Sequence, residues 1–276
     1  MRFGFIIVIL ITGLFQVEAG RSSMAESPNQ TTDALQPFLA TTQASINHAA
    51  WADFVAKLSR KRAGSKNETQ FLRYAFNRIH HQFLKRFAAN TTFASLFDDG
   101  TYNCLTGTIL YSILLNHFEI DHQVIETNYH IFILVQTQEG EVLIEITDPQ
   151  DGFVTSADKL TKRIEQYRQQ GIQPADPALF YYQYNFDLYN IVSQHELIGL
   201  LYYNLAVDSF NQKDLQKAVH YLGRAIERYA SPRIEEFSEI LLVAVHESNL
   251  KEREKILCKK ELQTIRYKAL LVMAGI

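Results

Sequence analysis

Cysteine is scarce in this chain, which has two cysteines, Cys104 and Cys258, among 276 residues. Exported proteins usually pair their cysteines in disulfides. These two lie in different contexts, because Cys104 follows a glycine-containing turn and Cys258 lies within a charged helical pattern. We therefore expect both thiols to be unpaired, with a disulfide between them as the alternative. A free thiol is prone to oxidation outside the cytoplasm, which suggests that Cys104 has a chemical role.

An excess of basic residues is also missing. The chain has 27 Lys and Arg against 30 Asp and Glu, a formal net charge of −3. Binding to a phosphate backbone requires a concentrated basic surface. The basic stretches 57–66 and 251–260 are short or interleaved with glutamate, which is typical of solvated helix faces. Nucleic acid is therefore not expected as a partner.

Motifs for phosphate and metal binding are absent from the sequence. No glycine-rich phosphate loop is present, and His195-Glu196 lacks the second histidine of a zinc-protease helix. His80 and His81 are adjacent, so they face different directions on a helix. We expect neither a cofactor nor a metal ion.

The N-terminus has the pattern of an export signal. Arg2 precedes an apolar run over 3–15, and Val17-Glu18-Ala19 fits a cleavage site before Gly20. The run is shorter than the roughly 20 residues of a transmembrane helix, and no lipobox cysteine follows it. We expect a cleaved signal peptide (1–19), a periplasmic or extracellular location, and no transmembrane span after cleavage. An uncleaved membrane anchor is the alternative.

The spacing of apolar residues predicts helices and then strands. A polar flexible leader is expected over 20–45, and a domain over 46–192. Its helices are predicted over 45–62, 67–87, 104–117 and 156–170, and its strands over 122–127, 130–137, 141–148 and 178–185.

The remaining segment, 193–276, is predicted to be entirely helical. Part of it resembles a tetratricopeptide repeat, through Tyr202, Leu205, Ala206, Phe210, Ala218, Leu222, Ala225 and Pro232. Such repeats need neighbours to bury their apolar faces. We expect this single unit to pack on the preceding domain or to hold a protein partner.

Cys104 and His130 are the residues best suited to chemistry. Cys104 opens an apolar helix, where unpaired backbone N–H groups favour a thiolate and can hold an oxyanion. His130 follows on a strand and can serve as the base. We expect a thiol pKa well below the free value of about 8.5.

A third residue is needed to orient His130, and two carboxylates compete for that role. A three-residue hairpin tip sets His130 opposite Asp148, and a two-residue tip sets it opposite Pro149. On a straight strand, Glu145 lies roughly 13 Å from His130 along the sheet. Asp148 is therefore favoured, and Glu145 remains open.

Three short stretches, 100–108, 129–132 and 145–149, resemble the Cys-His-Asp signature of the transglutaminase-like superfamily. The likeness is greatest to exported bacterial members with a helical repeat behind the core. It implies a papain-like α+β fold in which Cys104 is the acyl-accepting nucleophile, His130 the base and Asp148 the orienting acid. Members often carry tryptophan near the histidine, whereas this chain has only Trp51.

Two functions are compatible with this resemblance. The first is a cysteine-dependent acyl-transfer enzyme, namely a peptidase, amidase or transglutaminase that acts on a peptide or protein substrate. The alternative is a non-catalytic binding module that keeps the fold and docks a partner through its helical tail.

Overall fold

The computed structural model describes residues 32–169 and 188–274, which contain helices and one main antiparallel sheet. The elements, in chain order, are α2 (Gln36–Leu39), the 3-10 helix η1 (Ala40–Thr42), α3 (His48–Ala63), α4 (Glu68–Phe83), β1 (Arg86–Phe87), α5 (Ser95–Asp98), β2 (Thr101–Tyr102), α6 (Cys104–His117), β3 (His122–Thr127), β4 (Ile131–Thr137), β5 (Gly140–Ile144), β6 (Phe153–Val154), α7 (Ala157–Gln169), β7 (Tyr189–Val192), α8 (Gln194–Asn211), α9 (Leu215–Ile226), α10 (Pro232–Glu247) and α11 (Glu252–Met273). This is an α+β arrangement.

Helices α3 and α4 both begin at asparagine caps. The side chain of Asn47 accepts the N–H of Ala49 at 3.0 Å, and that of Asn67 accepts the N–H of Gln70 at 2.9 Å. Trp51 is fully buried in α3. The apolar side of α4 is buried through Phe71, Leu72, Ala75, Phe76, Ile79 and Phe83. Both helices therefore pack inward, as their spacing predicted.

Helix α6 is buried along most of its length. Its start is fixed by a capping box, in which Asn103 Oδ1 accepts the N–H of Thr106 and Thr106 Oγ1 accepts the N–H of Asn103. The bounds Cys104–His117 are the predicted ones. The cap places Cys104 in the first helical position.

The main sheet has the strand order β6-β5-β4-β3-β7, and all neighbours are antiparallel. In the β4–β5 hairpin Thr137 pairs with Gly140, which has φ +125°. Both registers considered from the sequence are therefore wrong. The three-residue tip differs from the observed register by one residue and the two-residue tip by two. Continued past Ile144, this register places Thr147 opposite His130.

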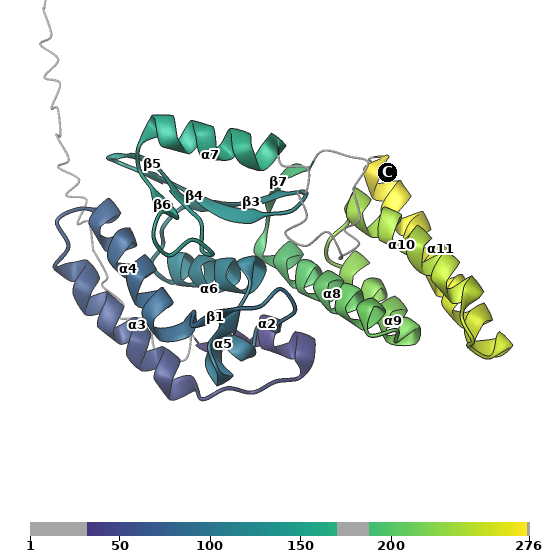
Figure 1. Ribbon diagram of the computed structural model, residues 1–276. Helices are drawn as coiled ribbons and strands as arrows, with labels where there is room; N and C mark the ends of the chain where they lie inside the picture. The colour runs from purple at the N-terminus through teal and green to yellow at the C-terminus, as the bar shows by residue number, and fades with distance from the viewer. Residues whose placement is uncertain (1–31, 170–187, 275–276) are drawn as a thin grey trace, which may run out of the picture.

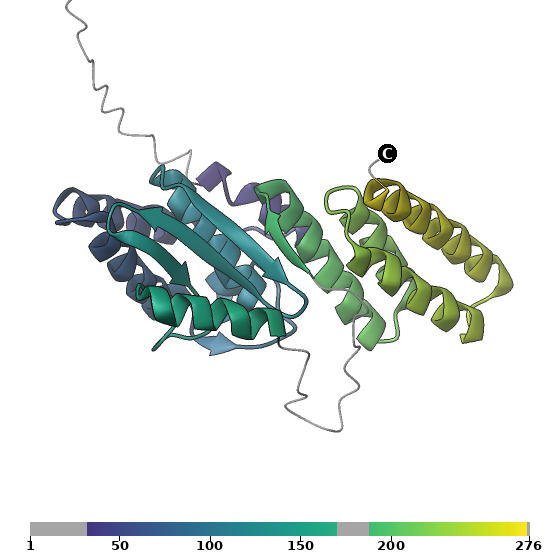
Figure 2. The ribbon, with the colours of Figure 1, turned by 90° about the horizontal axis from the view of Figure 1, so that it is seen from above.

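The sheet is covered on both faces (Figures 1 and 2). Helix α7 packs on one face, where Ile125, Phe132, Leu134, Leu143, Val154 and Leu160 form a small core. Helix α6 lies on the other face, against Val124, Ile131, Ile133, Val135, Val142 and Ile144. The alternation along each strand thus supplies both cores.

Helices α8 to α11 extend from one side of the sheet-bearing part (Figure 2). Ala206, Ala218 and Ala225 are fully buried in the α8–α9 pair. Leu197 and Leu201 of α8 belong to the same continuous core as the residues of α6. A polar link joins the two parts as well, because Gln194 Nε2 donates to Ser112 Oγ at 2.7 Å.

Two expectations differ from the structure or lie outside it. The predicted flexible leader is wrong at its C-terminal end, because Leu35, Phe38 and Leu39 are buried and 36–42 is helical. The predicted signal peptide 1–19 and strand 178–185 lie outside the described residues. Among the described residues, none of the helices combines the length and the apolar character needed to cross a bilayer.

Candidate active site

Cys104 is half-buried at the N-terminus of α6. One turn later, Gly107 packs so closely on Ile146 that an added Cβ would lie 2.3 Å from Ile146 Cγ2. Residues three apart share a helix face, so the face that carries Cys104 meets the segment after β5. His80 supports that segment from α4, since its Nε2 lies 2.8 Å from the carbonyl oxygen of Ile146.

The thiol of Cys104 is not activated in this arrangement. Burial raises its pKa, and the negative charge of Glu145 adds to that effect, to about 11. The backbone N–H groups of Leu105 and Cys104 and the charge of Arg233 act in the opposite direction and are outweighed. The expectation of a lowered thiol pKa is therefore wrong for the free protein. The backbone N–H groups at the start of α6 lower the thiol pKa, as predicted, but burial raises it by more.

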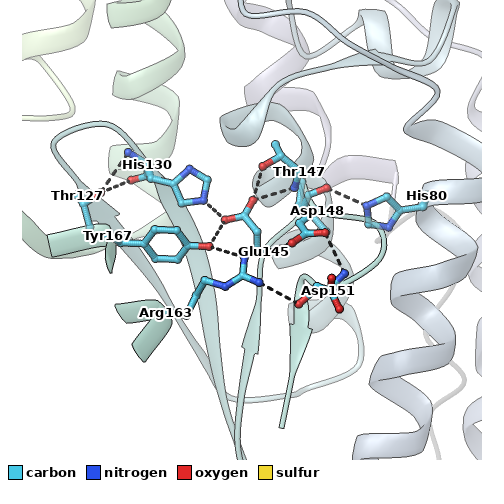
Figure 3. Close-up of polar contacts among 10 residues, drawn as sticks. His80, Thr127, His130, Glu145, Thr147, Asp148, Asp151, Arg163 and Tyr167 are labelled. Carbon is cyan, nitrogen blue, oxygen red and sulfur yellow. Dashed lines mark hydrogen bonds and ion pairs between the residues drawn. The ribbon is translucent and has the colours of Figure 1, made fainter. Parts of the chain in front are cut away.

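His130 is held in a tight turn just before β4. The N–H of Thr127 donates to the carbonyl oxygen of His130 at 2.8 Å, and the N–H of His130 donates to Thr127 Oγ1 at 3.1 Å. The imidazole packs against the ring of Tyr167 on α7, with centroids 4.6 Å apart. Figure 3 shows the ring directed toward Glu145. The turn and the packing of Tyr167 together orient the imidazole.

Glu145 is the carboxylate that contacts His130, through Oε2 and the imidazole Nε2. The same oxygen accepts the hydroxyl of Tyr167 at 3.0 Å. Oε1 accepts the N–H of Thr147 at 2.8 Å and its hydroxyl at 2.5 Å. The side chain is 3% exposed, and both of its oxygens have donors inside the protein, as a buried carboxylate requires.

The contact with Glu145 favours one tautomer of His130. A carboxylate only accepts hydrogen bonds, so the neutral imidazole that suits this contact carries its hydrogen on Nε2 and its lone pair on Nδ1. Burial lowers the pKa of His130, and Glu145 opposes this effect in part while Arg163 adds to it. The imidazole is therefore neutral around pH 7, with Nδ1 as a base.

Asp148 does not contact His130, contrary to our expectation. Its carboxylate binds Arg163 Nη1 at 3.2 Å and accepts the N–H of Asp151 at 2.9 Å (Figure 3). Burial raises the pKa of Asp148, but these contacts outweigh it and the net pKa is lowered. The reason for the difference is the end of β5. The chain leaves the β4 ladder after Ile144, and the N–H of Glu145 donates instead to the carbonyl oxygen of Gly152 at 2.7 Å.

Tyr167 and Arg163 were not singled out from the sequence, although both belong to this site. Arg163 Nη1 lies 3.4 Å from the hydroxyl of Tyr167, which in turn donates to Glu145. They are four residues apart on α7, and therefore on one face of that helix. That spacing was the available signal, but nothing local indicates that this face covers His130.

The structure thus brings His130, Glu145 and Tyr167 into contact and places Cys104 within the electrostatic reach of Glu145. Within 32–169 and 188–274, the thiol of Cys104 forms no hydrogen bond to His130. Cys104 and Cys258 are both free, one on α6 and the other on α11. Comparisons with protein-family models, curated proteins and solved structures gave no match.

Proposed function

We propose that this chain is a cysteine-dependent acyl-transfer enzyme that acts on a carboxamide or peptide bond. Cys104 is the nucleophile, His130 the general base through Nδ1, and Glu145 the orienting acid. Two observations support the proposal: the buried Glu145 carboxylate contacts Nε2 of His130, and helix α6 begins with Cys104. The fold proposed for this site is the papain-like, transglutaminase-like one.

The chemistry divides into two steps. The thiol of Cys104 adds to the carbonyl carbon while His130 Nδ1 takes its proton, and the imidazolium then protonates the leaving amine as the C–N bond breaks. The resulting thioester is attacked by water or by an amine, which gives its proton to His130. The C–S bond breaks and the thiol regains the proton. N–H groups at the start of α6 face the developing oxyanion.

The raised thiol pKa is better explained by this sequence of events than by a preformed pair of Cys104 thiolate and His130 imidazolium. Both the thiol and the imidazole are neutral in the free protein, so proton transfer accompanies attack. Catalytic hydrogen bonds are often long without substrate and shorten when it binds. A peptide or protein outside the cytoplasm is the proposed substrate.

An activated acyl ester tests the nucleophile without knowledge of the natural substrate. We expect p-nitrophenyl acetate to add one acetyl group to the Cys258→Ala protein, seen by intact mass, and to be turned over. Cys104→Ala in that background should lose both adduct and turnover. His130→Gln should slow turnover by about 10²-fold or more. Equal acetylation with and without Cys104 would overturn the proposal.

A non-catalytic binding module is the second candidate. It is favoured by exposed apolar side chains on the last helix, among them Ile256, Leu257 and Tyr267. The acyl-ester experiment separates the two functions, because a binding module has no turnover that depends on Cys104.

A further inference from the structure

Arg233 lies at the start of α10, in the helical tail, yet its side chain reaches the turn that carries His130. Its Nη2 donates to the carbonyl oxygens of Thr127 and Asn128, each at 3.0 Å. It also forms an ion pair with Glu126 on β3 at 3.1 Å. The side chains of Arg233 and Glu126 are 11% and 4% exposed, so this is a buried interaction.

Two tyrosines of the tail complete the surroundings of this ion pair. Tyr229 donates its hydroxyl to Glu126 Oε2 at 2.5 Å, and the guanidinium lies 5.6 Å from the ring centroid of Tyr203. Tyr229 is itself held by α8, because Gly199 leaves no room for a side chain beside it. The tail therefore fixes the guanidinium from several directions.

The turn is also held from within and by β7, because Thr127 pairs with Tyr189. Thr127 and His130 bind each other through backbone and hydroxyl groups, and Asn128 Oδ1 accepts the N–H of Leu188 at 2.5 Å. All three of the Arg233 contacts are made by Nη2, which lies one bond farther along the side chain than the ammonium of a lysine would. A lysine at this position cannot reach the same oxygens without a shift of the backbone. Arg233 thus joins the tail directly to the backbone of this turn.

We propose that Arg233 is a positioning residue for His130, so that the helical tail forms part of the active site. This inference rests on the proposed function for its catalytic meaning. The hydrogen bonds of the guanidinium hold the backbone at 127 and 128 in place, and this keeps the imidazole in contact with Tyr167 and Glu145. The positive charge of Arg233 also acts on Cys104, whose pKa it lowers in opposition to burial.

The test compares Arg233→Gln and Arg233→Lys with Arg266→Gln, all in the Cys258→Ala protein. Arg266 is the matched control, since its ion pairs join α11 to Glu235 and Glu239 of α10 rather than to the turn. Lysine keeps the charge opposite Glu126, so this variant retains the fold if glutamine does not. The first readout is amide hydrogen exchange at Thr127 and His130. The second is the titration of the His130 ring by NMR, which depends on Glu145, Arg163 and the ring of Tyr167 around it.

In both Arg233 variants the amide hydrogens of Thr127 and His130 should exchange at least tenfold faster than in the parent protein. The amides of β4 should stay protected. As the imidazole becomes hydrated, its pKa should rise toward the ordinary value. Arg266→Gln should change neither readout. Unchanged exchange and titration in Arg233→Lys would overturn the inference, whatever its activity. If the parent protein showed no Cys104-dependent acetylation, the proposed function would be overturned instead. Hydrogen exchange and the titration of His130 do not depend on that reaction, so the two failures are distinguishable.

Discussion

Tyr167 donates its hydroxyl to the same oxygen of Glu145 that faces His130, and its ring packs against that imidazole at a tilt of 40°. Removing the hydroxyl takes away one hydrogen bond to a buried carboxylate, worth about 1.5–3 kcal/mol. We expect Tyr167→Phe to lower the turnover of p-nitrophenyl acetate about tenfold, with the protein still folded. Tyr189→Phe is the control, because Tyr189 packs beside the same small core. Equal rates for both variants would show that the hydroxyl has no role.

The two carboxylates near His130 should differ sharply when neutralised. Glu145→Gln removes the charge that favours one tautomer of His130, and a loss of about 10²–10⁴-fold in turnover is expected. Asp148→Asn removes a partly exposed ion pair with Arg163 and should cost less than about tenfold. Steady-state rates of the two variants decide the assignment. A greater loss of turnover for Asp148→Asn would instead support Asp148 as the orienting acid, as favoured from the sequence.

Alkylation of Cys104 should depend steeply on pH. Its pKa of about 11 lies above that of a free thiol, so the native thiol ionises at higher pH than the unfolded one. Near pH 8.5, under about 1% of native thiols carry charge, against about half in the unfolded chain. Iodoacetamide should therefore react about a hundredfold more slowly with native Cys258→Ala protein than with the same protein in urea. A rate that is already level near pH 7 would indicate a preformed thiolate–imidazolium pair.

Local signals in the sequence determined much of the fold. The apolar run over 104–117 gave the bounds of α6, and the Ile- and Val-containing stretch over 122–127 gave those of β3. The hairpin register was wrong because Gly140, with its positive φ, pairs with Thr137, a possibility that was not weighed. Glu145 was judged too distant because a straight strand was assumed, whereas β5 ends at Ile144. Contacts made by α7 and α10 with the site depend on tertiary packing, which no local pattern records.

Gly107 should tolerate no larger side chain. The Cβ of Gly107→Ala would lie 2.3 Å from Ile146 Cγ2, and Ile146 is buried beside the segment that holds Glu145. Overpacking of this kind costs about 1–3 kcal/mol of unfolding free energy, which urea denaturation measures. Gly223→Ala is the control, because its nearest contact is the flexible end of Glu261. That variant should be unchanged or stabilised by up to about 1 kcal/mol. Equal stabilities would show that Ile146 moves aside freely.

The helical tail should be inseparable from the rest of the protein. Leu197 and Leu201 of α8 share one hydrophobic core with α6, and Gln194 donates to Ser112 across the same boundary. A chain that ends at Val192 exposes this apolar surface, beyond what soluble monomers tolerate. It also loses Arg233 from the turn before His130.

We therefore expect the chain that ends at Val192 to aggregate, as light scattering will detect, and to melt without the cooperative transition of the full protein. A chain that ends at Leu271 is the control, since it keeps every contact with the core described above. Cys104 in the truncated chain should react with iodoacetamide at the rate of an unfolded thiol, because the burial that raises its pKa is lost. A soluble fragment with the melting temperature and thiol reactivity of the full protein would contradict this expectation. The tail would then be an independent binding module, and the turn at His130 would hold its position without Arg233.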